Sequence, residues 1–196
     1  YNTKIVDLII TALLDSFSLR RGNSKSLALL VESHGRVNLA GHESSQIVGW
    51  FTTLAPLILQ TSVKEYPDKI RYVKTLLNEF SEKAFDYSLL STLGKNFDNS
   101  IPITNLIGFN YLGTVKPDTN NRILGTEQAA VSLNVAPNKL RPLLTELLAY
   151  IHNSELCIEV AYNKKFTSTN LNQEKLNKFS SALTALVKHC SEQKTQ

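Results

Sequence analysis

A carboxylate, an imidazole and a guanidinium lie within five consecutive residues of this chain, at Glu32, His34 and Arg36. Carboxylates and imidazoles are the side chains that most often move protons near neutral pH. The apolar run that precedes Glu32 indicates a buried strand with the carboxylate at its end, where partial burial would raise the carboxyl pKa. Taken alone, the segment fits two interpretations of Glu32: a structural strand-end glutamate, exposed or ion-paired, or a group that carries out acid/base chemistry.

The two basic side chains of this segment have different expected roles. His34 could shuttle a proton or stabilise an enolate, or it could fix the loop through a hydrogen bond, and both roles remain open. The guanidinium of Arg36 is a rigid fork of donors that is typical of binding to carbonyl or carboxylate groups. We therefore expect Arg36 to orient the segment rather than to react.

Two further pairs of side chains are candidates for lining a substrate cleft. Trp50 and Phe51 follow a glycine in an apolar run, where an aromatic pair either lines a tunnel or belongs to the core. Asn110 and Tyr111 carry polar tips that could reach the cleft or could satisfy buried backbone groups. All four are secondary candidates beside Glu32.

The candidates above lie in three short stretches, at residues 32–36, 48–52 and 109–113. In order and spacing these stretches resemble the signatures of the epimerization domains of non-ribosomal peptide synthetases, which belong to the condensation-domain superfamily. The resemblance covers nearly the whole chain, from the helix around Asp7 to the closing helix through His189. Two departures concern glycines: Ser33 stands where the family has glycine, and Ser81–Ser88 keeps only Tyr87 of a glycine-rich motif. The matching stretches are E-S-H-G-R at 32–36 (family E-G-H-G-R), V-G-W-F-T at 48–52 and F-N-Y-L-G at 109–113.

The resemblance implies a fold and a domain organisation. The fold is an α/β sandwich of the chloramphenicol-acetyltransferase-like type, in which a mixed sheet is covered by helices. Residues 1–196 would be the C-terminal lobe of such a domain. The N-terminal lobe, which carries an H-H-x-x-x-D-G motif in this family, would be absent, because no His-His pair occurs in the chain.

The resemblance also implies a function, namely L-to-D epimerization of an aminoacyl or peptidyl thioester. The substrate would arrive on the phosphopantetheine arm of a peptidyl carrier protein, and no cofactor would be bound directly. Glu32 would be one member of the acid/base pair and a histidine of the missing lobe the other, so the isolated chain is expected to be inactive. The alternatives are a condensation-domain lobe that forms peptide bonds and a non-catalytic module that docks a carrier protein.

The elements that must position these residues follow from hydrophobic spacing. Apolar residues three and four apart indicate helices, and short apolar or alternating runs indicate strands. Residues 140–151 fit a helix or a strand, and we prefer a hairpin that turns at His152-Asn153-Ser154. The expected elements are a helix over 3–19, a strand over 26–33, a loop over 35–45, an irregular segment feeding a strand over 47–59, a helix from 66 to 80, a strand over 103–111, a polar turn over 116–122, a strand over 156–162 and a helix over 172–191.

Composition limits the partners. The net charge of +4 is mildly basic, but the lysines and arginines are scattered, so nucleic-acid binding is not expected. No apolar run is long enough for a membrane helix, and we expect a cytoplasmic location. The histidines and the two cysteines, Cys157 and Cys190, have no ligand-like spacing, so no metal site is predicted. A lobe without its partner should expose an apolar or wet face through which it could pair with another copy.

Overall fold

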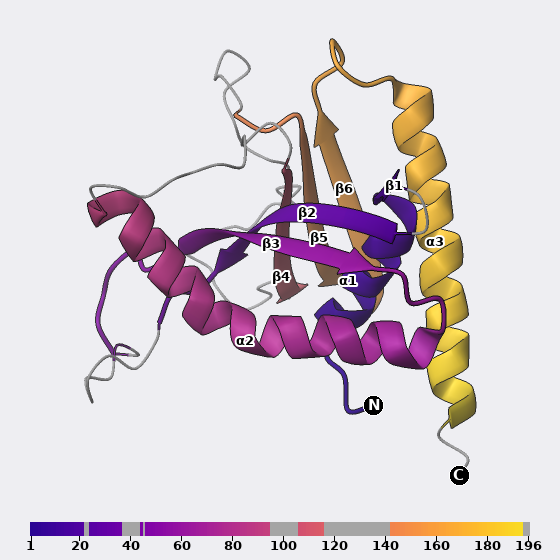
Figure 1. Ribbon diagram of the computed structural model, residues 1–196, viewed down its shortest axis with the longest axis horizontal. Helices are drawn as coiled ribbons and strands as arrows, with labels where there is room; N and C mark the ends of the chain where they lie inside the picture. Colours follow the sequence, from indigo (N-terminus) through magenta and orange to yellow (C-terminus); the bar gives the residue numbers. More distant parts are fainter. Residues whose placement is uncertain (22–23, 37–43, 45, 95–105, 116–141, 194–196) are drawn as a thin grey trace, which may run out of the picture.

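The structure is a computed structural model that describes residues 1–21, 24–36, 44, 46–94, 106–115 and 142–193. Within these residues three helices and six strands form one α/β unit (Figure 1). Their order along the chain is α1 (Ile5–Ser16), β1 (Leu19–Arg21), β2 (Ser24–Ser33), β3 (Thr53–Thr61), α2 (Tyr66–Leu93), β4 (Ile107–Val115), β5 (Thr145–His152), β6 (Glu155–Tyr162) and α3 (Thr169–Glu192).

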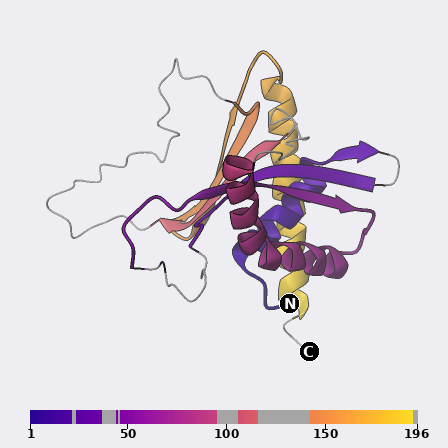
Figure 2. The same cartoon turned by 60° about the vertical axis from the view of Figure 1, so that its left-hand side comes forward.

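The described strands form one mixed sheet, as the sequence predicts. Strand β2 pairs antiparallel with β1 and β3 and parallel with β4, β4 pairs parallel with β5, and β5 pairs antiparallel with β6. Figures 1 and 2 show that β2 and β3 run across the upright direction of β4, β5 and β6. The sheet is therefore strongly twisted, in keeping with the twist that L-residues give to strands.

The hydrophobic core lies between one face of this sheet and the helices. Side chains alternate between the two faces of a strand, so every second residue of β2 and β3 points toward the helices. Phe109 on β4, Leu147 on β5 and Phe179 on α3 complete the same cluster. The buried core residues of β2 and β3 are Leu27, Leu29, Val31, Ala55, Leu57 and Leu59.

Helix α1 is buried on nearly all sides, whereas the sequence predicts an amphipathic helix. Its apolar stripe faces the sheet, and its outer side is covered because α3 packs over it (Figure 1). The two buried hydroxyls on the helix are satisfied internally: Thr11 Oγ1 donates to the Asp7 carbonyl and Ser16 Oγ donates to the Ala12 carbonyl, each at 2.7 Å. The polar residues thus fit a buried helix without unpaired groups.

The preferred hairpin at 145–162 is confirmed. Strands β5 and β6 pair from Thr145 with Tyr162 to His152 with Glu155. The two residues between them, Asn153 and Ser154, have φ of 49° and 66°. Positive φ at both central positions is the two-residue turn that matches the twist of paired strands.

Helix α2 and strand β4 both continue well past their predicted ends. Helix α2 continues from Phe80 to Leu93, and Ala84 and Tyr87 extend its core-facing stripe at helical spacing. Strand β4 runs past Gly113, where φ is +73° and the pairing with β5 shifts between Tyr111 and Thr114. This irregularity is a bulge, which a glycine accommodates within a strand. The predicted turn over 116–122 and most of the loop over 35–45 lie outside the described residues.

Helix α2 also lies along the outer edge of β3. The Gln60 backbone N–H donates to Tyr72 Oη at 2.9 Å, and Ser88 Oγ donates to the Leu54 carbonyl at 3.2 Å. Both backbone groups point away from β2, since the partners of β3 in the sheet lie on its other side. Side chains of α2 therefore satisfy part of an otherwise unpaired strand edge.

Asp15 joins three elements through two ion pairs. Its carboxylate lies 2.7 Å from Lys69 Nζ on α2 and 2.5 Å from Lys25 Nζ on β2. Burial alone would raise the pKa of Asp15, but the two lysines outweigh burial and hold the pKa below 3.8. Only 7% of the Lys69 side chain is exposed, so its charge depends on this partner.

We expect Asp15→Asn to lower the free energy of unfolding by about 3 kcal/mol, because it leaves the Lys69 charge buried without its carboxylate. Urea denaturation of the wild type and the variant measures this. Because the folded-state pKa of Asp15 is depressed, its contribution is present above pH 3.8 and is lost as the pH falls below that value. The control Glu79→Gln breaks an exposed pair with Lys83 and should change stability by less than about 0.5 kcal/mol. Equal losses in the two variants would contradict the assignment.

Candidate functional site

Glu32 and Asn110 meet because β2 and β4 run parallel. Val31 pairs with Phe109, and both belong to the core on the helix side of the sheet. The next residue on each strand is therefore on the opposite face, which places Glu32 beside Asn110. The Asn110 Nδ2 group donates to Glu32 Oε2 at 2.6 Å. This bond fixes the orientation of the carboxylate.

The pKa of the Glu32 carboxyl is raised above its usual value of 4.5. Although part of the side chain is open to solvent, enough protein surrounds the carboxylate that partial desolvation is the main cause. The hydrogen bond from Asn110 lowers the pKa, and the negative charge of Glu146 on β5 raises it. The net effect brings the group closer to the range in which it both takes and gives protons.

A pocket of about 390 Å³ opens beside Glu32 at this end of the sheet. It brings together four of the predicted site residues: Glu32, His34, Asn110 and Tyr111. A volume of this size falls within the range of small-molecule sites. The start of α1 and the middle of α2 supply the other wall, so the pocket lies between the sheet edge and two helices. Its lining does not include Arg36, Trp50 or Phe51.

The turn after β2 depends on Gly35. Its φ is +60°, and a Cβ at this position would lie 1.7 Å from the Phe51 carbonyl oxygen. The His34 Nδ1 atom accepts the Arg36 backbone N–H at 3.0 Å, which closes the turn. In the neutral ring this bond leaves the proton on Nε2. His34 thus has the loop-fixing bond and also borders the pocket.

Arg36 binds carbonyl groups, as its fork of donors predicts. Its Nη1 atom donates to the carbonyls of Ser44 and, at 3.0 Å, Ile47. The guanidinium stacks over the Phe51 ring, 4.3 Å from its centroid. The side chain of Trp50 is 90% exposed. Arg36 therefore ties the turn after β2 to the segment that leads into β3.

The missing glycines do not distort the described backbone. Ser33 is the last residue of β2 and pairs with Thr53, so it has extended geometry that any residue adopts. Ser88 and Tyr87 lie within α2, which needs no glycine. The substitutions therefore leave the local elements regular.

Several polar residues near the site were not among the candidates that the sequence offered. Asp7 on α1 and Asn78 on α2 line the pocket, but both occur within helices whose pattern indicated only core packing. The buried Asp7 carboxylate accepts the Lys4 backbone N–H at 2.7 Å and so begins α1. Glu146 lies in β5. In the sequence it is a single carboxylate within an apolar run that fits a helix or a strand, so the face on which it lies could not be predicted.

Metal ligation and membrane insertion find no support in the described part of the chain. No group of three or more His, Cys, Asp or Glu side chains there could hold a metal ion. Both cysteines are free thiols. None of the described helices is long and apolar enough to cross a membrane.

Comparison with known proteins gives one family. A family model described as "Condensation domain" matches residues 3–196. Bacitracin synthase 1 of Bacillus licheniformis is 28% identical over 192 residues, which are 97% of this chain and 4% of that protein. Nonribosomal peptide synthetase 5 of Gibberella zeae is 30% identical over 196 residues, which are 95% of this chain and 2% of that protein.

Solved structures show the same fold. The epimerization domain from the third module of tyrocidine synthetase B matches with a TM-score of 0.76 and 24% identity, over 97% of this chain and 43% of that chain. The condensation domain from Monacolin K polyketide synthase matches with a TM-score of 0.58 and 15% identity, over 91% of this chain and 40% of that chain. The chain thus spans less than half of either solved chain.

We expect Gly35→Ala to destabilise the chain by about 3 kcal/mol, because it combines an unfavourable left-handed backbone with a clash against the Phe51 backbone. Gly113→Ala is the matched control, since Gly113 also has positive φ but nothing lies within 4 Å of its added Cβ. The control should lose only about 1 kcal/mol. Thermal or urea unfolding measures both, and equal losses would show that close packing at Gly35 is unimportant.

Proposed function

Because the chain belongs to the condensation-domain family, we propose that it is the C-terminal lobe of a peptide synthetase epimerization domain. In this proposal Glu32 exchanges the α-proton of an aminoacyl or peptidyl thioester that a carrier protein delivers on its phosphopantetheine arm. The family relation rests on the match over residues 3–196, and the greater fold similarity to an epimerization domain than to a condensation domain favours epimerization.

The observation that carries the proposal is the state of Glu32. A carboxylate with a raised pKa lies on the border of a pocket, and a neighbouring amide holds one of its oxygens. A structural glutamate at a strand end has no need of partial desolvation. A group that must accept a proton and later release it needs such an environment, because its two protonation states must be close in free energy.

The chemistry requires two groups on opposite sides of the α-carbon. The base takes the proton as the Cα–H bond breaks, and the bonding electrons move toward the thioester oxygen as an enolate. A second group then donates a proton to the other face of the carbon, which inverts its configuration. Glu32 supplies one of these groups, and the resemblance places the other, a histidine, on an N-terminal lobe.

The open face of the sheet is suited to a covering lobe. Leu54 and Ile58 on β3 are 48% and 40% exposed, and they lie on the same face as Glu32 because they pair with Glu32 and Ala28 of β2. Exposed apolar residues on the face that carries the reacting group support a partner there. The second lobe would then also exclude water from the enolate.

Condensation remains the second candidate because the matching family model is that of condensation domains. A condensation lobe would help to join two carrier-bound acyl groups through an amide. The two activities are distinguished by product: epimerization gives a D-aminoacyl thioester with no new peptide bond.

We expect Glu32→Gln, in the domain completed by its N-terminal lobe, to lower α-hydrogen exchange by about 10²- to 10⁴-fold, because the amide cannot accept the proton. The measurement is incorporation of solvent deuterium into the carrier-bound aminoacyl group, followed by mass spectrometry. The control is Glu155→Gln. Glu155 is exposed on the same face of the sheet, beside the turn of the β5–β6 hairpin, and its variant should exchange at the wild-type rate. Exchange at the wild-type rate in Glu32→Gln would refute the catalytic role and favour a carrier-docking module.

We also expect the 196-residue chain alone to bring about no detectable exchange, since one proton-transfer group and the cover of the open face are absent. Chiral analysis of the aminoacyl group after incubation with the loaded carrier tests this. Restored exchange on addition of a separately produced N-terminal lobe would support the proposal. Racemization by the chain alone would show that Glu32 needs no partner or is not the reacting group.

A further inference from the structure

The absence of a side chain at Gly108 lets a second carboxylate lie across the middle of the sheet. Gly108 on β4 pairs with Leu30 of β2 on one side and with Glu146 of β5 on the other. A Cβ built on Gly108 would lie 3.2 Å from Glu146 Cγ and 2.8 Å from Leu143 Cδ1. The Glu146 side chain therefore covers the position that a β4 side chain would occupy.

Glu146 and Glu32 lie on the same open face. Leu147, which follows Glu146, is buried in the core with Phe109, so Glu146 points away from the helices as Glu32 does. Glu32 is two residues further along the parallel strands than Leu30, the neighbour of Gly108. The two carboxylates thus approach each other diagonally across β4, with Asn110 beside Glu32.

The charged and titratable groups around Glu32 come from several elements. Lys4 and Asp7 at the start of α1, and His34 after β2, line the same pocket, as does Tyr111 of β4. Helix α2 contributes the uncharged Asn78 to this wall. Glu146 comes from the opposite side, from β5.

We propose that Glu146 is a positioning residue for the reaction, which acts through Glu32 by placing a like charge across the glycine gap in β4. The inference rests on the proposed function, because it assigns Glu146 to the control of the same proton transfer. Glu146 need not touch the substrate. Its role is to disfavour the ionised form of Glu32, while the Asn110 amide favours it.

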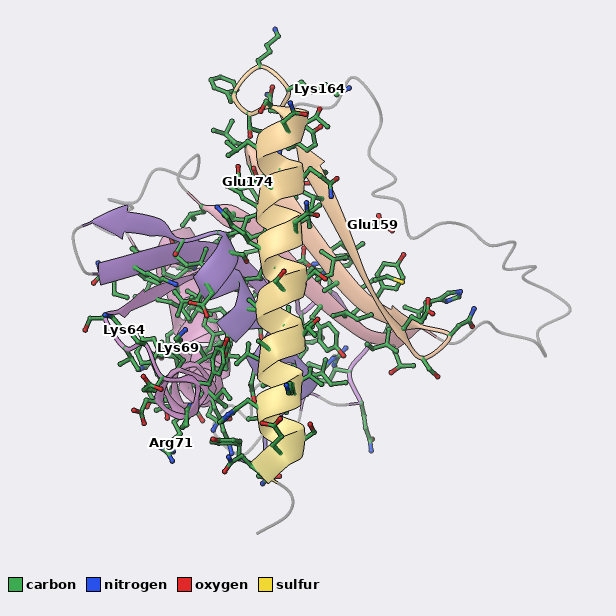
Figure 3. The ribbon with its side chains drawn as sticks, turned by 90° about the vertical axis from the view of Figure 1, so that its right-hand side faces the viewer. Lys64, Lys69, Arg71, Glu159, Lys164 and Glu174 are labelled. Atoms are coloured by element: carbon green, nitrogen blue, oxygen red, sulfur yellow. The ribbon has the colours of Figure 1, made fainter. Side chains whose placement is uncertain are left out.

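The geometry across Gly108 and the electrostatics of Glu32 support this division of roles. Burial is the main cause of the raised pKa of Glu32. Of its two polar neighbours, Asn110 lowers the pKa through its hydrogen bond and Glu146 raises it through its charge, so they act in opposite directions. Among the described residues, Glu159 of β6 also lies on this face of the sheet, and the Tyr150 hydroxyl donates to it at 2.8 Å. Figure 3 shows Glu159 on the side of the sheet away from α3.

The test is a carboxyl titration of the chain itself, with ¹³C-labelled glutamate and assignment of Glu32 through Glu32→Gln. We expect Glu146→Gln to move the Glu32 midpoint to lower pH, since it removes a negative charge. Glu146→Asp, which keeps the charge, should leave the midpoint near the wild-type value. Asn110→Ala should move it to higher pH, because a donor to the ionised form is lost. Amide spectra of each variant confirm that it is folded.

Glu155→Gln is the matched control, because Glu155 lies on the same face of the sheet but at the far end of the hairpin. It should leave the Glu32 midpoint unchanged. A midpoint that does not move in Glu146→Gln, or that moves equally in Glu155→Gln, overturns the proposal whatever the chain catalyses.

The exchange rate of the completed domain gives the second readout. A base with a lower pKa loses its proton at lower pH but is a weaker base. The Glu146→Gln domain should therefore exchange the α-hydrogen faster than wild type at acidic pH and more slowly on the alkaline plateau. A uniform loss at every pH would show a structural role and overturn the proposal. If the midpoint moves but Glu32→Gln keeps the wild-type exchange rate, the proposed function fails, and with it the catalytic meaning of Glu146.

Discussion

The parallel pairing of β2 with β4 is the constraint on which the site depends. It brings the end of β2 beside a strand far away in sequence, so that Asn110 Nδ2 lies 2.6 Å from Glu32 Oε2. The core-facing residues Val31 and Phe109 fix the register, because a slip of either strand by one residue would turn its polar side chain into the core. Packing on one face of the sheet thus sets the chemistry on the other.

The two ion pairs of Asp15 and the tight turn at Gly35 both stabilise the elements that hold the site. The first ties α1 to β2 and α2, the elements that form the two walls of the pocket. The second sets where the chain leaves β2, directly after Glu32. Both stabilise the frame without contributing a reacting atom. The same fold occurs in the epimerization domain of tyrocidine synthetase B at only 24% sequence identity.

Much of the fold could be predicted from the sequence because it rests on local periodicity. The apolar spacing of α1, the strand that ends near Glu32 and the hairpin turn at Asn153 are all local signals. Asn110 was a secondary cleft candidate, but its bond to Glu32 could not be predicted, since the pairing of β2 with β4 joins residues 78 positions apart. Glu146 escaped notice because an apolar run with one carboxylate fits a helix or a strand, and only the register places it over Gly108.

The contacts of Tyr72 and Ser88 of α2 with the backbone of β3 have a consequence for how the protein can assemble. An uncovered edge strand is a template on which another chain can add a strand, and such additions lead to aggregation. Helix α2 occupies backbone groups of Gln60 and Leu54 on that edge, so sheet extension from β3 is obstructed. Strand β6 lies at the other edge of the described sheet and carries Glu155 and Glu159. Like charges at this edge oppose edge-to-edge pairing of identical copies.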